Sequence, residues 1–185
     1  MQVIPLIRHA STPCSYVREV DVRVDLLSAD RIAFYYRIEG DIDQLQLPSP
    51  RRSAHADGLW KHTCFEAFIR RPGTPAYIEL NFSPSSEWAI YRFDDYRAGM
   101  RAIEAAPAPR ILCRRREDRL EADVDVSLPA LDLSTRDELH IAVSAVLEDQ
   151  HGQISYWALA HAPQKPDFHH PDGFVFKLPP DAGVA

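Results

Sequence analysis

Three segments of the sequence, residues 58–69, 76–93 and 155–174, combine aromatic side chains with acids, amides or imidazoles. Each begins with the alternating pattern of a strand, although a strand with a purely structural role needs only apolar and solvated residues. A sugar requires both kinds of group, because its hydroxyls form hydrogen bonds while its C–H face stacks on an aromatic ring. The three segments therefore indicate a binding surface for a small polar ligand.

The elements that position these side chains are strands. Apolar and charged residues alternate over 19–26 and 120–126, and further strands are expected over 32–38, 111–115, 141–148 and 154–159. Strands separated by turn residues at roughly ten-residue spacing predict an all-β antiparallel sandwich of about 8–10 strands, four or five in each sheet. Little helix is expected, at most a turn or two within 94–101 and 127–132.

The register of the central hairpin follows from burial. Placing Glu66 opposite Asn81 puts every apolar side chain of the two strands on one face, whereas a one-residue slip would set polar groups against them. These apolar residues are Phe65, Ala67 and Ile69 in one strand and Ile78, Leu80 and Phe82 in the other. The same reasoning assigns Ala89, Tyr91 and Phe93 of the next strand to the core.

The opposite face then carries Glu66, Phe68 and Arg70, followed by Tyr77, Glu79 and Asn81, and by Trp88, Ile90 and Arg92. Two interpretations remain open. The face is a groove in which an aromatic ring stacks on a ligand while Glu66, Glu79 and Asn81 form hydrogen bonds with it. Alternatively, a second layer covers the face, Trp88 is ordinary packing, and Glu79 pairs with Arg92 across the strands.

The segments GLWKHTCFEAFI and AYIELNFSPSSEWAIYRF resemble the signature of DOMON-like domains, which are similar to the ninth family of carbohydrate-binding modules. The closing SYWALAHAPQKPDFHHPDGF resembles the C-terminal stretch of bacterial proteins of that group. The likeness runs from about residue 59 to 176 and implies a β-sandwich of jelly-roll type. Ser86 stands where the module often has glycine, so the geometry of that turn is expected to differ.

The resemblance implies either sugar binding through tryptophans or haem binding through a Met and a His. Carried over to this chain, the sugar alternative gives stacking by Trp60, Trp88 and Trp157, with Glu66, Glu79 and Asn81 as polar contacts. Arg92, on the same predicted face, is a further candidate ligand contact. The haem alternative depends on Met100, because the other methionine is the initiator.

A histidine-rich loop suggests a second kind of site. His161, Asp167 and His169 lie close together in the sequence, and His62 could join them if the loop folds over the hairpin. Such side chains are ligands for Zn²⁺ or Fe²⁺. We expect instead that they pair locally, with no metal and no cofactor bound.

Catalysis is the remaining alternative. A sugar-active enzyme needs two carboxylates across the sugar, and Glu66 and Glu79 would lie on adjacent strands of one face. No glycine-rich phosphate loop exists among the seven glycines. We expect binding of a carbohydrate or sugar-derived metabolite rather than catalysis.

Composition limits the class of protein. The 185 residues are expected to form one domain, 1–185, with a frayed tail over 179–185. A net charge of −6 disfavours nucleic acid as a partner, and no apolar run is long enough to span a membrane. Three widely spaced cysteines predict no disulfide framework, which favours a cytoplasmic protein.

Overall fold

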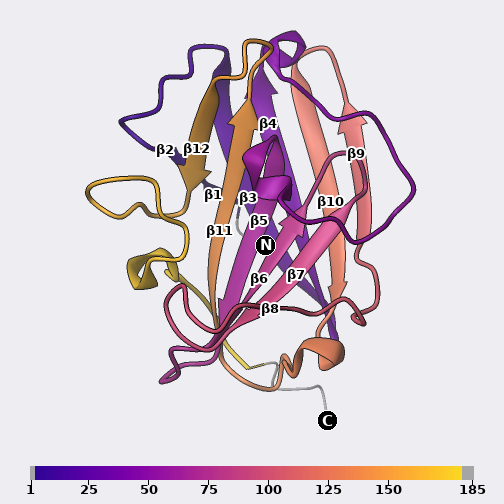
Figure 1. Cartoon of the computed structure of the whole chain (residues 1–185), viewed down its shortest axis with the longest axis vertical. Coiled ribbons are helices and arrows are strands. Elements are labelled where there is room, and N and C mark those ends of the chain that lie inside the picture. Colours follow the sequence, from indigo (N-terminus) through magenta and orange to yellow (C-terminus); the bar gives the residue numbers. More distant parts are fainter. Residues whose placement is uncertain (1–2, 181–185) are drawn as a thin grey trace.

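Two antiparallel sheets lie face to face in the computed structural model, which describes residues 3–180 (Figure 1). The first sheet has five strands in the order β1–β3–β4–β10–β9. The second has eight, in the order β2–β12–β11–β5–β6–β7–β8, with β13 paired to β11. The predicted all-β sandwich is confirmed.

The strands of the first sheet are β1 (Val3–Pro5), β3 (Val17–Ser28), β4 (Arg31–Gly40), β9 (Arg110–Arg115) and β10 (Arg119–Ser127). Those of the second are β2 (Ile7–Arg8), β5 (Cys64–Arg70), β6 (Tyr77–Phe82), β7 (Trp88–Phe93), β8 (Arg101–Ala102), β11 (Leu139–Glu148), β12 (Ile154–Ala158) and β13 (Phe176–Leu178). Nine of the thirteen described strands have five or more residues, and the short ones at the edges account for the excess over the predicted number.

Helix is confined to four three-residue 3₁₀ turns in the described part of the chain. They are η1 (Ile42–Gln44), η2 (Leu59–Lys61), η3 (Pro129–Leu131) and η4 (Pro171–Gly173). Residues 94–100 form a loop rather than the expected helical turn, because Arg97 and Gly99 both take positive φ angles that no helix allows. None of the helical segments within residues 3–180 has the length and apolar character needed to cross a membrane. The tail expected to fray lies, from residue 181 on, outside the described residues.

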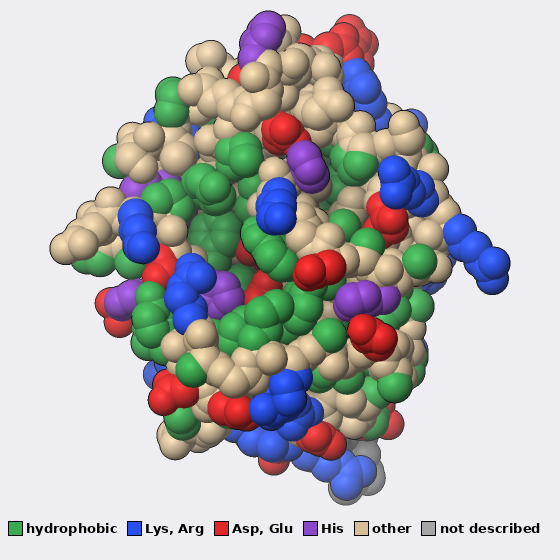
Figure 2. Space-filling model, in the orientation of Figure 1, with side chains coloured by type: hydrophobic (Ala, Val, Ile, Leu, Met, Phe, Trp, Pro, Cys, Tyr) green, Lys and Arg blue, Asp and Glu red, His purple; other side chains and the backbone are tan. Residues whose placement is uncertain are grey.

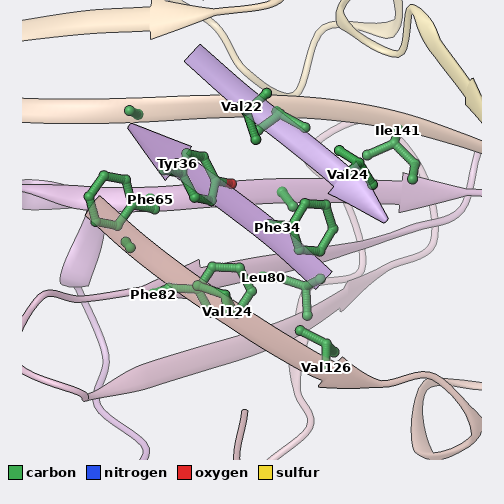
Figure 3. Close-up of a cluster of buried hydrophobic side chains, with 14 of the residues drawn as sticks. Val22, Val24, Phe34, Tyr36, Phe65, Leu80, Phe82, Val124, Val126 and Ile141 are labelled. Carbon is green, nitrogen blue, oxygen red and sulfur yellow. The ribbon is translucent and has the colours of Figure 1, made fainter. Parts of the chain in front are cut away.

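The core fills the space between the sheets, and both contribute to it (Figure 3). Alternate residues of β3 and β10 point inward as predicted, among them Val22, Val24, Val124 and Val126. The second sheet contributes Phe65, Leu80 and Phe82 from β5 and β6, all completely buried. The ring of Tyr36 stacks on Phe65 with 4.8 Å between centroids, and its hydroxyl donates to the backbone carbonyl of Glu66 at 2.8 Å. This hydrogen bond joins the two sheets through the core.

Candidate functional site

The outer face of β5 and β6 has the predicted register. Glu66 lies opposite Asn81, and Phe68 opposite Glu79, while the apolar residues between them enter the core. Glu66, Phe68, Tyr77, Glu79 and Asn81 therefore share the face of the second sheet that points away from the first sheet.

The prediction of which side chains of the next strand, β7, face the core was wrong. Trp88 of β7 lies opposite Phe82, and Ile90 lies opposite Leu80, so Trp88 and Ile90 enter the core with their partners. Directly opposed side chains share a face, and the five-residue connection 83–87 fixes this pairing. The residues of β7 on the outer face are Ala89, Tyr91 and Phe93.

Loops cover part of this outer face. Phe68, Tyr91 and Phe93 pack with Trp60 of η2 and with Phe168 and Phe174 from the loop after β12. Tyr77 and Phe93 are stacked, with their planes 6° apart and 4.7 Å between centroids. The interpretation in which a second layer covers the face is therefore correct for much of it.

A cavity of about 390 Å³ remains between the sheet and these loops. This volume is at the low end of the range for small-molecule sites. Figure 2 shows the hollowed face, with apolar side chains inside the hollow and charged ones beside it. The lining residues are Trp60, Glu66, Glu79, Phe93, Arg97, Met100, Val146, Tyr156, Pro166, Phe168 and His169. Hollows of about 830 and 520 Å³ lie elsewhere in the described chain, but neither is lined by a tryptophan.

Glu66 is a buried carboxyl group in the wall of the cavity, with only 3% of its surface exposed. Ser144 of β11 donates its hydroxyl proton to Glu66 Oε2 at 3.2 Å. Burial raises the pKa of Glu66 well above its usual range, and the nearby carboxyl of Glu79 raises it further. Glu66 therefore holds its proton to a higher pH than an exposed glutamate does, and in the protonated form it can donate a hydrogen bond.

Glu79 is the second buried carboxyl group, with 5% of its surface exposed. Asn81 Nδ2 donates to Glu79 Oε1 at 2.7 Å. Burial raises the pKa of Glu79 to about 7, although the Asn81 hydrogen bond and the charge of Arg97 lower it. Glu79 can therefore gain or lose a proton near physiological pH.

His169 lines the same cavity and is held by a hydrogen bond with Tyr77. The backbone N–H of Arg97 donates to the hydroxyl oxygen of Tyr77 at 3.3 Å, and this hydroxyl is 2.7 Å from His169 Nδ1. Burial lowers the pKa of His169 to about 4, so the ring is neutral near pH 7. The other ring nitrogen, Nε2, is 3.8 Å from Glu79 Oε2.

A charged pair holds the histidine-containing loop over the sheet. Arg97, in the loop after β7, donates to Asp167 Oδ1 at 2.7 Å, and Tyr96 also donates to the Asp167 carboxylate. The backbone N–H of His169 donates to Asp167 Oδ1 at 3.2 Å. Asp167 thereby links the loop that carries His169 to the loop after β7 and keeps the cavity walls together.

The predicted ligand contacts divide into two groups. Trp60, Glu66 and Glu79 line one cavity, and Asn81 lies behind it as the hydrogen-bond partner of Glu79. The other three point elsewhere. Trp88 and Trp157 are buried in the core between the sheets, and the guanidinium of Arg92 pairs with Asp132 at 2.6 Å rather than with Glu79.

The histidine cluster disperses in the structure. His62 pairs with Glu148 at 2.7 Å, and His161 Nε2 lies 2.6 Å from the carbonyl oxygen of Ile7. Asp167 is bound by Arg97 and Tyr96, which leaves His169 alone at the cavity. Among residues 3–180 no three His, Cys, Asp or Glu side chains come together as a metal site would require.

Several cavity residues were not predicted. Tyr156 and Phe168 supply aromatic walls, and Arg97, Val146 and Pro166 are further lining residues that were not predicted. Tyr156 alternates with Trp157 along β12, so the choice of Trp157 as a ligand contact took the side chain on the wrong face. Met100 lines the same cavity as His169, but at 49% exposure it lies at the edge.

No protein-family profile matches the sequence, and the search of curated proteins found no match. A crystal structure of a protein from Bacteroides uniformis, named as a proposed carbohydrate-binding protein, aligns with 94% of this chain and 84% of its own. Its TM-score is 0.69 at 14% identity, which shows a shared fold. A family 9 carbohydrate-binding module from Caldicellulosiruptor kristjanssonii was solved with glucose and with cellotriose, and both structures align with 77% of this chain. The alignment covers 67% of the module in the glucose complex and 66% in the cellotriose complex, with a TM-score of 0.46 and 9% identity in both.

Proposed function

We propose that this protein binds a carbohydrate or a sugar-derived small molecule in the cavity on the outer face of the second sheet. The observation that carries the proposal is the combination of aromatic walls with buried hydrogen-bonding groups in one cavity of about 390 Å³. Small-molecule sites are concave, largely apolar, and hold a few polar groups that fix orientation. This cavity is concave and combines aromatic and aliphatic walls with a few buried polar groups, and its polar share is high, as a hydroxyl-rich ligand requires.

Each group has a role that follows from its state. Trp60 offers an indole ring at the cavity wall for stacking on the C–H face of a sugar. Glu66 donates a hydrogen bond to a ligand oxygen when it is protonated, and ionised Glu79 accepts hydrogen bonds from hydroxyl groups. The neutral ring of His169 has one nitrogen that donates and one that accepts. Donors and acceptors together suit a hydroxyl-rich ligand, because each hydroxyl both donates and accepts.

A sugar-active enzyme is the second candidate, and one observation favours it. Glu66 and Glu79 line the same cavity with different proton affinities, the arrangement in which one carboxyl group acts as acid and the other as base. Release of reducing sugar from oligosaccharides by the wild type, but not by Glu66→Gln or Glu79→Gln, would establish catalysis. Saturable binding without turnover would establish a binding protein.

The test of binding is a thermal-shift screen against monosaccharides and oligosaccharides, followed by titration calorimetry of each hit. We expect Trp60→Ala to weaken the affinity for a hit at least tenfold with little loss of stability, since Trp60 is half-buried at the cavity wall. Trp157→Phe is the matched control, because Trp157 is in the core and its loss should lower stability while leaving affinity unchanged.

Two outcomes would contradict the proposal. If no sugar raises the melting temperature while an unrelated metabolite does, the ligand is not a carbohydrate. If the purified protein shows a Soret absorption band, the cavity holds haem, for which Met100 and His169 are the available side chains.

We also propose a cytoplasmic location. The support is that Cys14, Cys64 and Cys113 are all unpaired thiols, as is usual in a reducing compartment. Fractionation of cells that produce the protein tests this, and recovery outside the cytoplasm would contradict it.

A further inference from the structure

The two buried carboxyl groups of the cavity have no strong cationic partner. Within residues 3–180, no Lys or Arg nitrogen lies within 4.0 Å of Glu66 or Glu79. His169 Nε2 is within this limit of Glu79, at 3.8 Å, and His169 is neutral. Burying a carboxylate without a compensating charge costs free energy, and both groups hold their protons more tightly for this reason.

Hydrogen bonds satisfy only part of these carboxyl groups. In the described chain, Glu66 accepts through Oε2 from Ser144, and Glu79 accepts through Oε1 from Asn81. Oε1 of Glu66 and Oε2 of Glu79 accept no hydrogen bond from the described residues. Both residues are more than nine-tenths buried and both line the cavity, so these oxygens are open to a ligand.

The other charges around Glu79 do not neutralise it. Arg97, from the loop after β7, lowers the pKa of Glu79 through its charge, but its guanidinium donates to the buried carboxylate of Asp167 and not to Glu79. Asp57, from the segment before η2, adds negative charge and accepts a hydrogen bond from Tyr91 of β7. No Lys or Arg of the described chain therefore forms an ion pair with Glu79, and this position is open to the cation of a ligand.

The aromatic walls have the same preference. Trp60, Phe93, Tyr156 and Phe168 line the cavity beside the carboxyl groups. The face of an aromatic ring is negative, so it attracts an ammonium group as well as the C–H face of a sugar. Aromatic rings with two carboxyl groups form a site for an organic cation.

We propose that the preferred ligand of the cavity is a sugar that carries a protonated amine, with the ammonium group between Glu66 and Glu79. This inference rests on the proposed function and narrows it to amino sugars. The ammonium group donates to the open oxygens of both carboxylates, and the ring stacks on the aromatic walls. No covalent step is involved, but the carboxyl protons leave to the buffer when the cation enters.

The test compares sugars that differ only at nitrogen. D-glucosamine, N-acetyl-D-glucosamine and D-glucose, with the corresponding galactose series, are titrated at pH 6.5, where the free amine is protonated. In at least one series we expect the amino sugar to bind at least tenfold more tightly than both neutral sugars. Calorimetry in two buffers of different ionisation heat should show net proton release when an amino sugar binds and none when a neutral sugar binds.

Variants connect this preference to the two carboxyl groups. Glu66→Gln and Glu79→Gln should each reduce the preference for the amine and the proton release, while neutral sugars still bind. Glu138→Gln is the matched control, because it removes the same charge at an exposed site beside His140 and should change neither. Two variants are used so that a folding defect in one leaves the other decisive.

The outcomes separate this inference from the proposed function. If an amino sugar and its neutral relatives bind equally, or the preference persists in both glutamine variants, the amine proposal is wrong and carbohydrate binding stands. If no sugar of either kind binds, both proposals are wrong.

Discussion

Glu79 holds its proton over a pH range in which the unfolded chain has already released it. Its pKa is about 7 in the folded protein against an ordinary value of 4.5, and burial is the main cause. Between these values the folded state binds more protons than the unfolded state, so this group makes stability fall as the pH rises. The effect is complete above the folded pKa.

Glu79→Gln should remove this dependence, because glutamine keeps the acceptor for Asn81 and has no charge to bury. From pH 5 to pH 8 the variant is expected to gain up to about 3 kcal/mol of unfolding free energy relative to the wild type. Urea denaturation of both proteins at several pH values measures the difference.

Other groups titrate in the same range, so the comparison with the wild type is essential. Glu66, whose pKa is also raised, makes stability fall as the pH rises, as Glu79 does. His169 has the opposite effect: burial lowers its pKa to about 4, so it makes stability rise between pH 4 and its ordinary pKa of 6.5. The His169 contribution is common to the two proteins, whereas the variant also removes the part of the Glu66 shift that the charge of Glu79 causes. If the unfolding free energies of the wild type and the variant change with pH in parallel, Glu79 has the same pKa in the folded and the unfolded protein.

At the scale of the element, the turn between β6 and β7 places a serine in a backbone conformation that favours glycine. Ser86 takes a φ of 78°, the left-handed conformation that glycine adopts without strain. The amide of Ser86 donates to the carbonyl of Ser83 at 3.0 Å, and Ser83 donates to Glu87 at 2.9 Å. The turn therefore has a glycine-type conformation at a serine.

Ser86→Gly is expected to stabilise the protein by about 0.5–1 kcal/mol, since the strain of the positive φ exceeds the extra backbone entropy of glycine in the unfolded chain. Thermal or urea unfolding measures this change, and sugar affinity should be unaltered because Ser86 does not line the cavity. A destabilised variant would mean that the serine side chain is needed in the turn.

At the scale of the whole molecule, one hydrophobic cluster contains residues of both sheets. Neither sheet can bury its inner face alone, so we expect the chain to unfold in a single cooperative transition. Far-ultraviolet circular dichroism follows the strands. Tryptophan fluorescence follows Trp88 and Trp157 in the core and Trp60 on the outer face.

Urea melts recorded by the two methods should coincide. A fluorescence change that precedes the loss of strand signal would show that the segment around Trp60 opens first. Two separate transitions in circular dichroism would contradict a single domain.

The sequence by itself determined the strands and the register of the central hairpin. Alternation in β3 and β10 and the apolar rows around Glu66 and Asn81 define which side chains must leave water, and burial on one face tolerates only one register. This local pattern was enough to bring Glu66, Glu79 and Asn81 to one face.

Only the tertiary structure decided the orientation of β7 and the walls of the cavity. The apolar pattern of β7 is ambiguous, because Trp88, Ala89, Ile90 and Tyr91 are all buried and both of its faces are covered. Phe168, His169 and Arg97 reach the site from loops, whose conformation depends on contacts such as Arg97 with Asp167 rather than on any repeating pattern. Loop contacts join residues far apart in the chain, and for that reason the sequence alone cannot specify them.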